Sequence, residues 1–373
     1  MLRLIAVRTS RQLGIILLAP GLACFSSCAV AQTNSTVAAR WLEAAGPVPE
    51  FKVPRSRAAW ARQRQQIRSQ LWSLLGALPP RPAKLTVQTL RREDRGHYLL
   101  EKFQFDNGAG DKVPGYLLLP KERSGPAPAI LYCHWHGGRY EVGKEELFRT
   151  NATPVPPGPS LAARGYVVLA IDTYCFGERN GAGPGGPGEI GSAGELTAAK
   201  FNLWLGRTLW GMMVRDDLLA LDYLCSRPEV DPSRIGITGI SMGSTRTWWA
   251  MALDERLRVG VGVCCLTRYQ NLIEQAGLKY HGIYYFVPGV LRHFDTEAIV
   301  ALAAPRPLLF LSGETDAGSP VDGIRIIERK VGAVYALYGQ RQNFQSHIYP
   351  GVGHLYTPDM WERMVAWMDA HLR

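Results

Sequence analysis

An apolar run that leads directly into the pentapeptide G-I-S-M-G at residues 239–243 constrains this chain more than any other feature. The run, residues 234–238, is short and β-branched, which predicts a buried strand. Residues 244–252 contain neither proline nor glycine, so a helix is expected to begin just past the serine. Glycines two positions before and after a serine keep such a sharp strand-to-helix turn free of side-chain collisions.

This local structure predicts that Ser241 is a nucleophile. The helix after it directs N–H groups and the positive end of its dipole at the site, which favours an anionic tetrahedral intermediate. G-x-S-x-G between a strand and a helix is the pattern of a nucleophile elbow. The alternative is a chance match in a chain with 39 glycines, and the flanking strand and helix argue against it.

A serine nucleophile needs a base and an orienting acid, and both candidates occur further along the chain. Asp316 follows an apolar strand predicted at residues 307–313, and His354 follows a last strand predicted at residues 346–350. The order Ser, acid, His at the ends of successive strands predicts His354 as the general base and Asp316 as its orienting acid. His347 lies inside the last strand, where a packing role is expected. The acids that remain as alternatives are Glu314, Asp322 and Asp295.

An oxyanion-binding loop is predicted after the apolar strand at residues 128–133. The next residues read H-W-H-G-G, and glycines in such a loop let the backbone approach a substrate carbonyl closely. We expect the backbone N–H groups of Met242, Gly137 and His136 to bind the oxyanion.

The same loop offers two further side-chain hypotheses. Trp135 adjoins the predicted oxyanion loop, and its ring is a candidate substrate contact. His134 and His136 have the spacing of a metal pair, but the neighbouring sequence supplies no further ligands at suitable spacing. The sequence therefore predicts neither a metal site nor an organic cofactor.

The motifs at residues 136–138 and 239–243, followed by Asp316 and His354, resemble those of the α/β-hydrolase superfamily. Within it the chain looks like the branch of dienelactone hydrolases, acetyl xylan esterases and prolyl oligopeptidases, in which a strand such as residues 166–172 leads into a segment such as F-G-E-R. The resemblance covers roughly residues 95–373. It implies an α/β fold with a mostly parallel central sheet, helices on both faces and a Ser-Asp-His site. Dienelactone hydrolases carry a cysteine nucleophile where this chain has Ser241.

Three segments are expected along the chain: a signal peptide at residues 1–31, an N-terminal helical extension at 32–95 and a catalytic domain at 96–373. The first segment has three arginines, an apolar stretch and an A-V-A cleavage signal, which predicts export to the periplasm or beyond without stable membrane insertion. Cys24 and Cys28 leave a lipoprotein as an alternative.

The formal net charge is +10, and residues 52–72 contribute six of the basic side chains with apolar residues between them. This pattern predicts an amphipathic helix that ends near Gly76. A basic helix can bind nucleic acid or an anionic membrane surface, but we expect the solvated face of an accessory helix and no nucleic-acid partner.

A glycine-rich segment at residues 180–195 contains a literal G-x-G-x-x-G. Two prolines interrupt it and no helix opens at once, so a mobile loop beside the site is expected rather than a dinucleotide site. A helix is predicted over residues 201–226. The long segment at 267–300 carries aromatic side chains that could wall the substrate pocket, namely Tyr269, Tyr280, Tyr284, Tyr285 and Phe286.

These features together predict an exported serine hydrolase that cleaves carboxylic esters through an acyl-enzyme. A small-molecule or carbohydrate ester is the expected substrate, with acetylated xylan as the favoured example on resemblance and export. A prolyl oligopeptidase-like peptidase is the first alternative, although residues 32–95 are too few for the propeller usual in that branch. A catalytically silent binding protein is the second, and the complete set of three residues argues against it.

Overall fold

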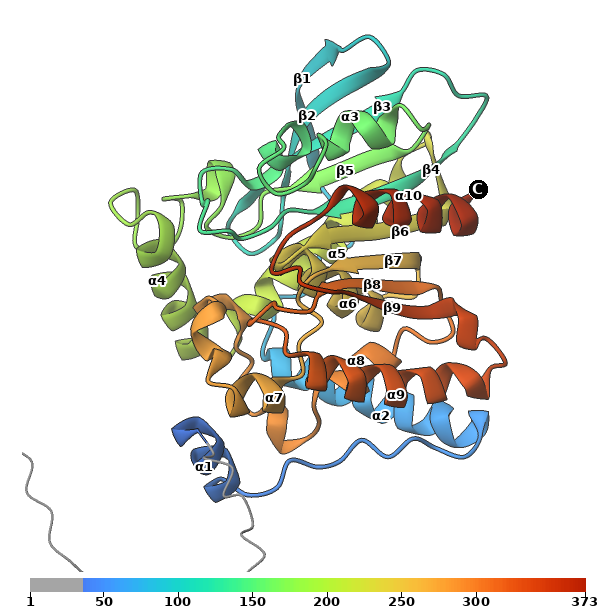
Figure 1. Ribbon diagram of the computed structural model, residues 1–373. Coiled ribbons are helices and arrows are strands. Elements are labelled where there is room, and N and C mark those ends of the chain that lie inside the picture. Colours follow the sequence, from blue (N-terminus) through green and yellow to red (C-terminus); the bar gives the residue numbers. More distant parts are fainter. Residues whose placement is uncertain (1–35) are drawn as a thin grey trace, which may run out of the picture. The chain divides into compact units, whose positions relative to one another are not determined.

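The computed structural model describes residues 36–373, so the predicted signal peptide lies outside the described residues. A nine-stranded sheet has the strand order β1-β2-β3-β5-β4-β6-β7-β8-β9 (Figure 1). Neighbours from β5 to β9 are parallel, whereas β1, β2, β3 and β5 pair antiparallel along the other part. The strands are β1 (Val87–Asp94), β2 (Tyr98–Asp106), β3 (Lys112–Pro120), β4 (Ala127–Cys133), β5 (Val167–Ile171), β6 (Val230–Ile240), β7 (Leu257–Val263), β8 (Leu308–Gly313) and β9 (Phe344–Tyr349).

Helices cover both faces of this sheet, which confirms the predicted α/β class (Figure 1). Within residues 36–373 no helix has the length and apolar character needed to cross a membrane. The α-helices are α1 (Val37–Ala44), α2 (Arg57–Leu75), α3 (Pro157–Ala162), α4 (Gly191–Trp204), α5 (Leu209–Ser226), α6 (Met242–Leu253), α7 (Tyr269–Glu274), α8 (Thr296–Ala301), α9 (Val321–Leu337) and α10 (Pro358–Leu372). The short 3-10 helices are η1 (Gly143–Phe148), η2 (Gly177–Arg179), η3 (Gly277–Tyr280), η4 (Ile283–Tyr285), η5 (Val290–Arg292) and η6 (Arg341–Asn343).

Central strand β4 shows why the sheet has a core on each side. Leu131 and Cys133 point into the cluster that also holds buried residues of α2, α5, α6, α8 and α9. Ile130 and Tyr132 point the other way, into the cluster formed with α3 and α10. Successive side chains of a strand face opposite sides, so a strand apolar at every position is buried on both faces.

Two segments differ from the sequence-based prediction. The helix expected over residues 201–226 is two helices, α4 and α5, and residues 205–208 break it; α4 begins at Gly191, within the loop expected over residues 180–195. Gly206 has a φ of +69°, which stops α4, and the Thr208 hydroxyl caps α5 by accepting from Gly211 N–H at 2.8 Å. The last residues of the predicted helical extension form β1, an exposed edge strand whose charged side chains conceal its strand character.

The basic helix α2 packs on the body of the protein as expected. Trp60, Ile67, Leu71 and Leu75 are buried in the cluster shared with α5 and α6. Arg64 and Arg68 both pair with Glu255, so part of the basic face meets the chain's own carboxylate.

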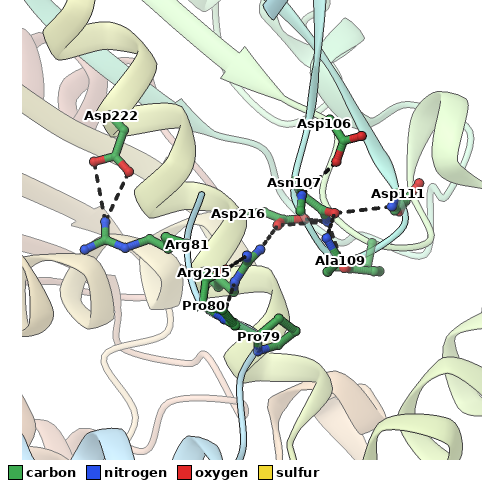
Figure 2. A network of polar contacts seen from close by, with 12 residues as sticks. Pro79, Pro80, Arg81, Asp106, Asn107, Ala109, Asp111, Arg215, Asp216 and Asp222 are labelled. Carbon is green, nitrogen blue, oxygen red and sulfur yellow. Dashed lines mark hydrogen bonds and ion pairs between the residues drawn. The ribbon is translucent and has the colours of Figure 1, made fainter. Parts of the chain in front are cut away.

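Helix α5 is fixed in place by polar contacts of its buried side chains Arg215 and Asp216 (Figure 2). The Asn107 amide in the β2–β3 turn donates to Asp216 Oδ1 at 3.2 Å. Arg215 donates to the carbonyl oxygens of Pro79 and Pro80 at 2.8 and 2.7 Å, which ties the segment after α2 to the same helix. These bonds join α5 to the β2–β3 turn and to the segment after α2.

A fully buried ion pair joins α5 to α6, the helix that begins after Ser241. Arg246 Nε lies 2.9 Å from Asp217 Oδ2, and a second guanidinium nitrogen binds Oδ1. Both side chains are inaccessible to solvent. Removing one partner of such a pair leaves an uncompensated buried charge.

We expect Asp217→Asn to lower the free energy of unfolding by about 3–5 kcal/mol, because Arg246 would stay buried without its carboxylate. Asp222→Asn is the matched control on the same helix, since its partly exposed pairs with Arg81 and Arg256 should contribute less than about 1 kcal/mol. Urea unfolding of the two variants measures the difference. Equal losses of stability would contradict this account of the α5–α6 contact.

Helix η1 places a carboxyl group beneath the end of β4. Glu146 Oε1 accepts from Tyr132 Oη at 2.6 Å, and Oε2 accepts from Trp135 N–H at 2.9 Å. Burial raises the pKa of Glu146 from 4.5 to about 7, and these hydrogen bonds offset only part of that effect.

This raised pKa predicts how stability depends on pH. The native state binds the Glu146 proton more tightly than the unfolded state, so the contribution is present at low pH and is lost as pH rises through about 7. Glu146→Gln, neutral in both states, removes this dependence. Between about pH 4 and 8 the wild type should lose up to about 3 kcal/mol relative to the variant, measured by urea unfolding. A difference that stays constant with pH would contradict the assignment.

Candidate active site

Ser241 occupies a strained turn between β6 and α6. Its φ and ψ are 59° and −117°, outside the regions that L-residues ordinarily adopt. A Cβ at Gly239 would lie 2.2 Å from the Cys133 carbonyl oxygen, and one at Gly243 would lie 2.0 Å from it. The turn therefore requires glycine at both positions, because the end of β4 passes directly against it.

Asp316 and His354 come together from the loops after β8 and β9. His354 Nδ1 lies 2.7 Å from Asp316 Oδ2, and Asp316 Oδ1 accepts from Gly318 N–H at 2.9 Å. The aspartate is buried and the imidazole is about one-third exposed. With Nδ1 occupied by the carboxylate, Nε2 remains available for proton transfer.

A second glycine contact explains why these two loops meet. A Cβ at Gly313, the last residue of β8, would lie 2.1 Å from the Gly353 carbonyl oxygen. Backbone hydrogen bonds join the loops on both sides, from Glu314 N–H to Tyr349 O at 3.0 Å and from Thr315 N–H to Val352 O at 2.9 Å. The Asp316–His354 pair thus rests on backbone packing.

The three alternative acids have other partners or positions. Glu314 accepts from Gly351 N–H at 2.9 Å, and Asp295 caps α8 by accepting from Thr296 N–H at 2.7 Å. Asp322 is exposed in the first turn of α9. His347 lies in β9, where its Nε2 is 3.2 Å from Gln345 Oε1.

Two adjacent cysteines lie beside the candidate residues. Cys265 Sγ is 3.8 Å from Ser241 Oγ, and Cys264 Sγ lies near the side-chain atoms of Asp316 and His354. Burial raises the pKa of Cys265 to about 12 and that of Cys264 well above its ordinary value. Both are therefore protonated thiols at neutral pH, and neither provides a thiolate for nucleophilic attack.

The Ser241 hydroxyl does not hydrogen-bond to His354 in this structure, where its contact is the Cys265 thiol. Hydrogen bonds between a catalytic base and its nucleophile are often long without substrate and tighten in the complex.

The predicted oxyanion loop begins where β4 ends, beside the start of α6. Gly137 and Gly138 have φ angles of +50° and +68°, which glycine adopts without strain. Among residues 36–373, the N–H groups of Met242, His136 and Gly137 find no hydrogen-bond acceptor, which leaves them free for an oxyanion.

Trp135 packs under this loop. Its ring is partly buried against the α10-side cluster, and a Cβ at Gly137 would lie 2.5 Å from a ring carbon. Substrate contact by Trp135 stays a prediction. His134 is fully buried, with Nδ1 2.8 Å from Trp135 O and Nε2 accepting from Thr173 N–H at 3.2 Å, so both ring nitrogens serve the loop's structure.

A pocket of about 390 Å³ opens at the Asp316–His354 pair. His281 Nε2 lies 3.0 Å from Gly318 O, and its ring stacks on Tyr285 at 4.2 Å. The lining residues are Cys265, Tyr280, His281, Thr315, Asp316, Ala317, Gly318 and His354.

The structure adds a residue that the sequence analysis did not single out. Glu195 on α4 is buried, and its Oε2 lies 2.9 Å from His136 Nε2. Its place at the end of the glycine-rich segment was the sole sequence signal, since no motif links it to a loop about sixty residues earlier. Tyr284, from the aromatic segment, stacks on His136 with ring centroids 5.1 Å apart.

Known proteins resemble this chain in sequence and in structure. The solved structures include one titled "putative acetyl xylan esterase" from Bacteroides fragilis (19% identity, TM-score 0.70, 90% of this chain and 94% of that one). A glucuronoyl esterase from Solibacter usitatus gives 19% identity and a TM-score of 0.65, with coverage of 87% and 98%. At these identities the structural likeness establishes the fold.

Sequence relatives establish the family. "Putative hydrolase YtaP" from Bacillus subtilis is 41% identical over 278 residues, 74% of this chain and 89% of the relative. A family model described as the Abhydrolase family matches residues 29–360. The chain therefore belongs to the Abhydrolase family of α/β-hydrolases, which confirms the resemblance to the dienelactone hydrolase and esterase branch.

Proposed function

We propose that this protein is a serine esterase that cleaves carboxylic esters. The observation that carries the proposal is the strained Ser241 elbow at the same edge of the sheet as the Asp316–His354 pair, whose atoms lie 2.7 Å apart. The family is one of hydrolases, and the two structural neighbours named above carry esterase titles.

In the proposed mechanism Ser241 Oγ attacks the ester carbonyl while His354 Nε2 takes its proton. The new C–O bond places negative charge on the carbonyl oxygen, where the N–H groups of Met242, Gly137 and His136 would bind it. His354 then protonates the leaving alcohol, and the acyl-enzyme forms. Water, activated by the same imidazole, releases the acid and restores Ser241.

A short-acyl ester of a carbohydrate, such as acetylated xylan, is the proposed substrate class. The residues that line the pocket at His354 include His281, Tyr280 and Thr315, whose side chains carry polar groups. These groups can hydrogen-bond sugar hydroxyls, whereas a long acyl chain would leave them unpaired.

We also propose that the protein is exported, on the sequence of residues 1–31. An exported esterase would meet polymeric carbohydrate outside the cytoplasm. Mass spectrometry of the N-terminus of the protein recovered from the periplasm tests this: a new terminus near Gln32 supports export, and an intact Met1 opposes it.

Ser241→Ala should lower kcat for p-nitrophenyl acetate by more than about 10⁴-fold, because the nucleophile is lost. Ser244→Ala is the matched control: this buried hydroxyl, three residues on in α6, has no hydrogen-bond partner among the described residues. An ester series from acetate to octanoate, with acetate release from acetylated xylan, tests the substrate class. Equal turnover by Ser241→Ala and wild type would refute the mechanism, and faster octanoate than acetate cleavage would refute the short-acyl assignment.

The identity of the acid is tested separately. Asp316→Asn should reduce kcat by about 10⁴-fold, because the amide favours the wrong imidazole tautomer. Glu314→Gln, two positions away in the same loop, should stay within about threefold of wild type, since its carboxylate contacts backbone rather than His354. A larger loss in Glu314→Gln than in Asp316→Asn would reverse the assignment.

A further inference from the structure

In the loop between β4 and η1, several backbone N–H and C=O groups form hydrogen bonds with side chains. Trp135 N–H donates to Glu146 Oε2 at 2.9 Å, and Trp135 O lies 2.8 Å from His134 Nδ1. Because His134 Nε2 accepts from Thr173 N–H, Nδ1 carries the hydrogen and donates to Trp135 O. The first part of the loop is thus held by buried side chains below it.

The second part of the loop is held by the His136 ring. His136 Nδ1 accepts from Gly138 N–H at 3.1 Å, so the ring hydrogen lies on Nε2 and is donated to Glu195 Oε2 at 2.9 Å. The same oxygen accepts from Tyr140 Oη at 3.2 Å. Glu195 is 2% exposed, so water competes little for these bonds.

Aromatic neighbours restrict the ring further. His136 stacks on Tyr284 at 5.1 Å with an interplanar angle of 21°. Tyr140 and Phe176 meet it edge-on, with centroids at 4.9 and 5.1 Å. The ring can therefore neither swing away nor flip without breaking contacts to three elements.

This arrangement decides which N–H groups of the loop remain unused. The hydrogens of Trp135 and Gly138 are occupied, and those of His136 and Gly137 are free among the described residues. Donors fixed before the reaction stabilise a developing oxyanion without having to reorganise.

We propose that Glu195 is a positioning residue for the oxyanion loop. By accepting from His136 Nε2 it fixes the ring whose Nδ1 accepts from Gly138 N–H. With the loop fixed in this way, the N–H groups of His136 and Gly137 stay free. The inference rests on the proposed esterase function. Glu195 acts through His136 and touches no substrate. Helix α4 carries Glu195 and thereby helps to position the oxyanion loop.

The test compares Glu195→Ala with Glu195→Gln. The glutamine oxygen can still accept from the neutral imidazole, so Gln should preserve the loop, whereas Ala removes the acceptor. Leu196→Ala is the matched control, since this side chain lies on the exposed side of the same helix. Circular dichroism and thermal melting verify that all three variants fold.

Two independent readouts are measured. The first is kcat and KM for p-nitrophenyl acetate, where Glu195→Ala should lose about 10- to 100-fold in kcat with KM changed less than about threefold. The second is hydrogen–deuterium exchange of the peptide covering residues 134–139, which should be faster in Glu195→Ala. Glu195→Gln and Leu196→Ala should match wild type in both.

The outcomes separate this inference from the proposed function. Unchanged kcat or unchanged exchange in Glu195→Ala overturns the positioning role, as does a Gln variant as impaired as Ala, which would mean that the carboxylate charge acts directly. If the wild type hydrolyses no ester, the proposed function fails, and exchange alone then decides: faster exchange in Glu195→Ala supports the hold on the loop, and unchanged exchange overturns it.

Discussion

The candidate site depends on the close approach of the Cys133 carbonyl, at the end of β4, to the turn that carries Ser241. A Cβ at Gly243 would lie 2.0 Å from this oxygen, so β4 and the start of α6 touch through backbone alone. The contact lies at the turn where Ser241 is strained, and it brings the end of β4, from which the predicted oxyanion loop continues, against the start of α6. Strain of this kind persists where the surrounding structure over-determines it, and here a central strand and a helix fully buried over its length do so.

The Asp316–His354 pair depends on a similar close backbone contact between two other loops. Gly313 meets the Gly353 carbonyl, and backbone hydrogen bonds join the loops that bear Asp316 and His354. Strands thus bring three separate loops to one edge of the sheet, while side chains of Glu146 and Glu195 hydrogen-bond to the fourth, the predicted oxyanion loop. The buried ion pair of Arg246 and Asp217 joins α6, the helix that follows Ser241, to α5.

Sequence patterns predicted the strands around the site well, because buried parallel strands are continuous apolar runs between turn residues. The expected strands at residues 128–133, 307–313 and 346–350 correspond to β4, β8 and β9. The break between α4 and α5 was missed because residues 201–226 contain no proline, and of their two glycines, Gly206 and Gly211, the left-handed φ of Gly206 is visible in three dimensions alone. Edge strand β1 was missed because charged side chains hide its alternation.

The sequence by itself determined the order of chemical groups: a serine flanked by glycines after a strand, then an aspartate and a histidine after later strands. This information is local, because it lies in the spacing of residues along the chain. Sequence position favoured Asp316 among four acids, and the tertiary structure decided that it meets His354 and that Glu195 reaches His136 from α4. Those pairs are separated by 38 and 59 residues, and no local pattern encodes such contacts. They arise because packing of the sheet and its helices brings these distant segments together.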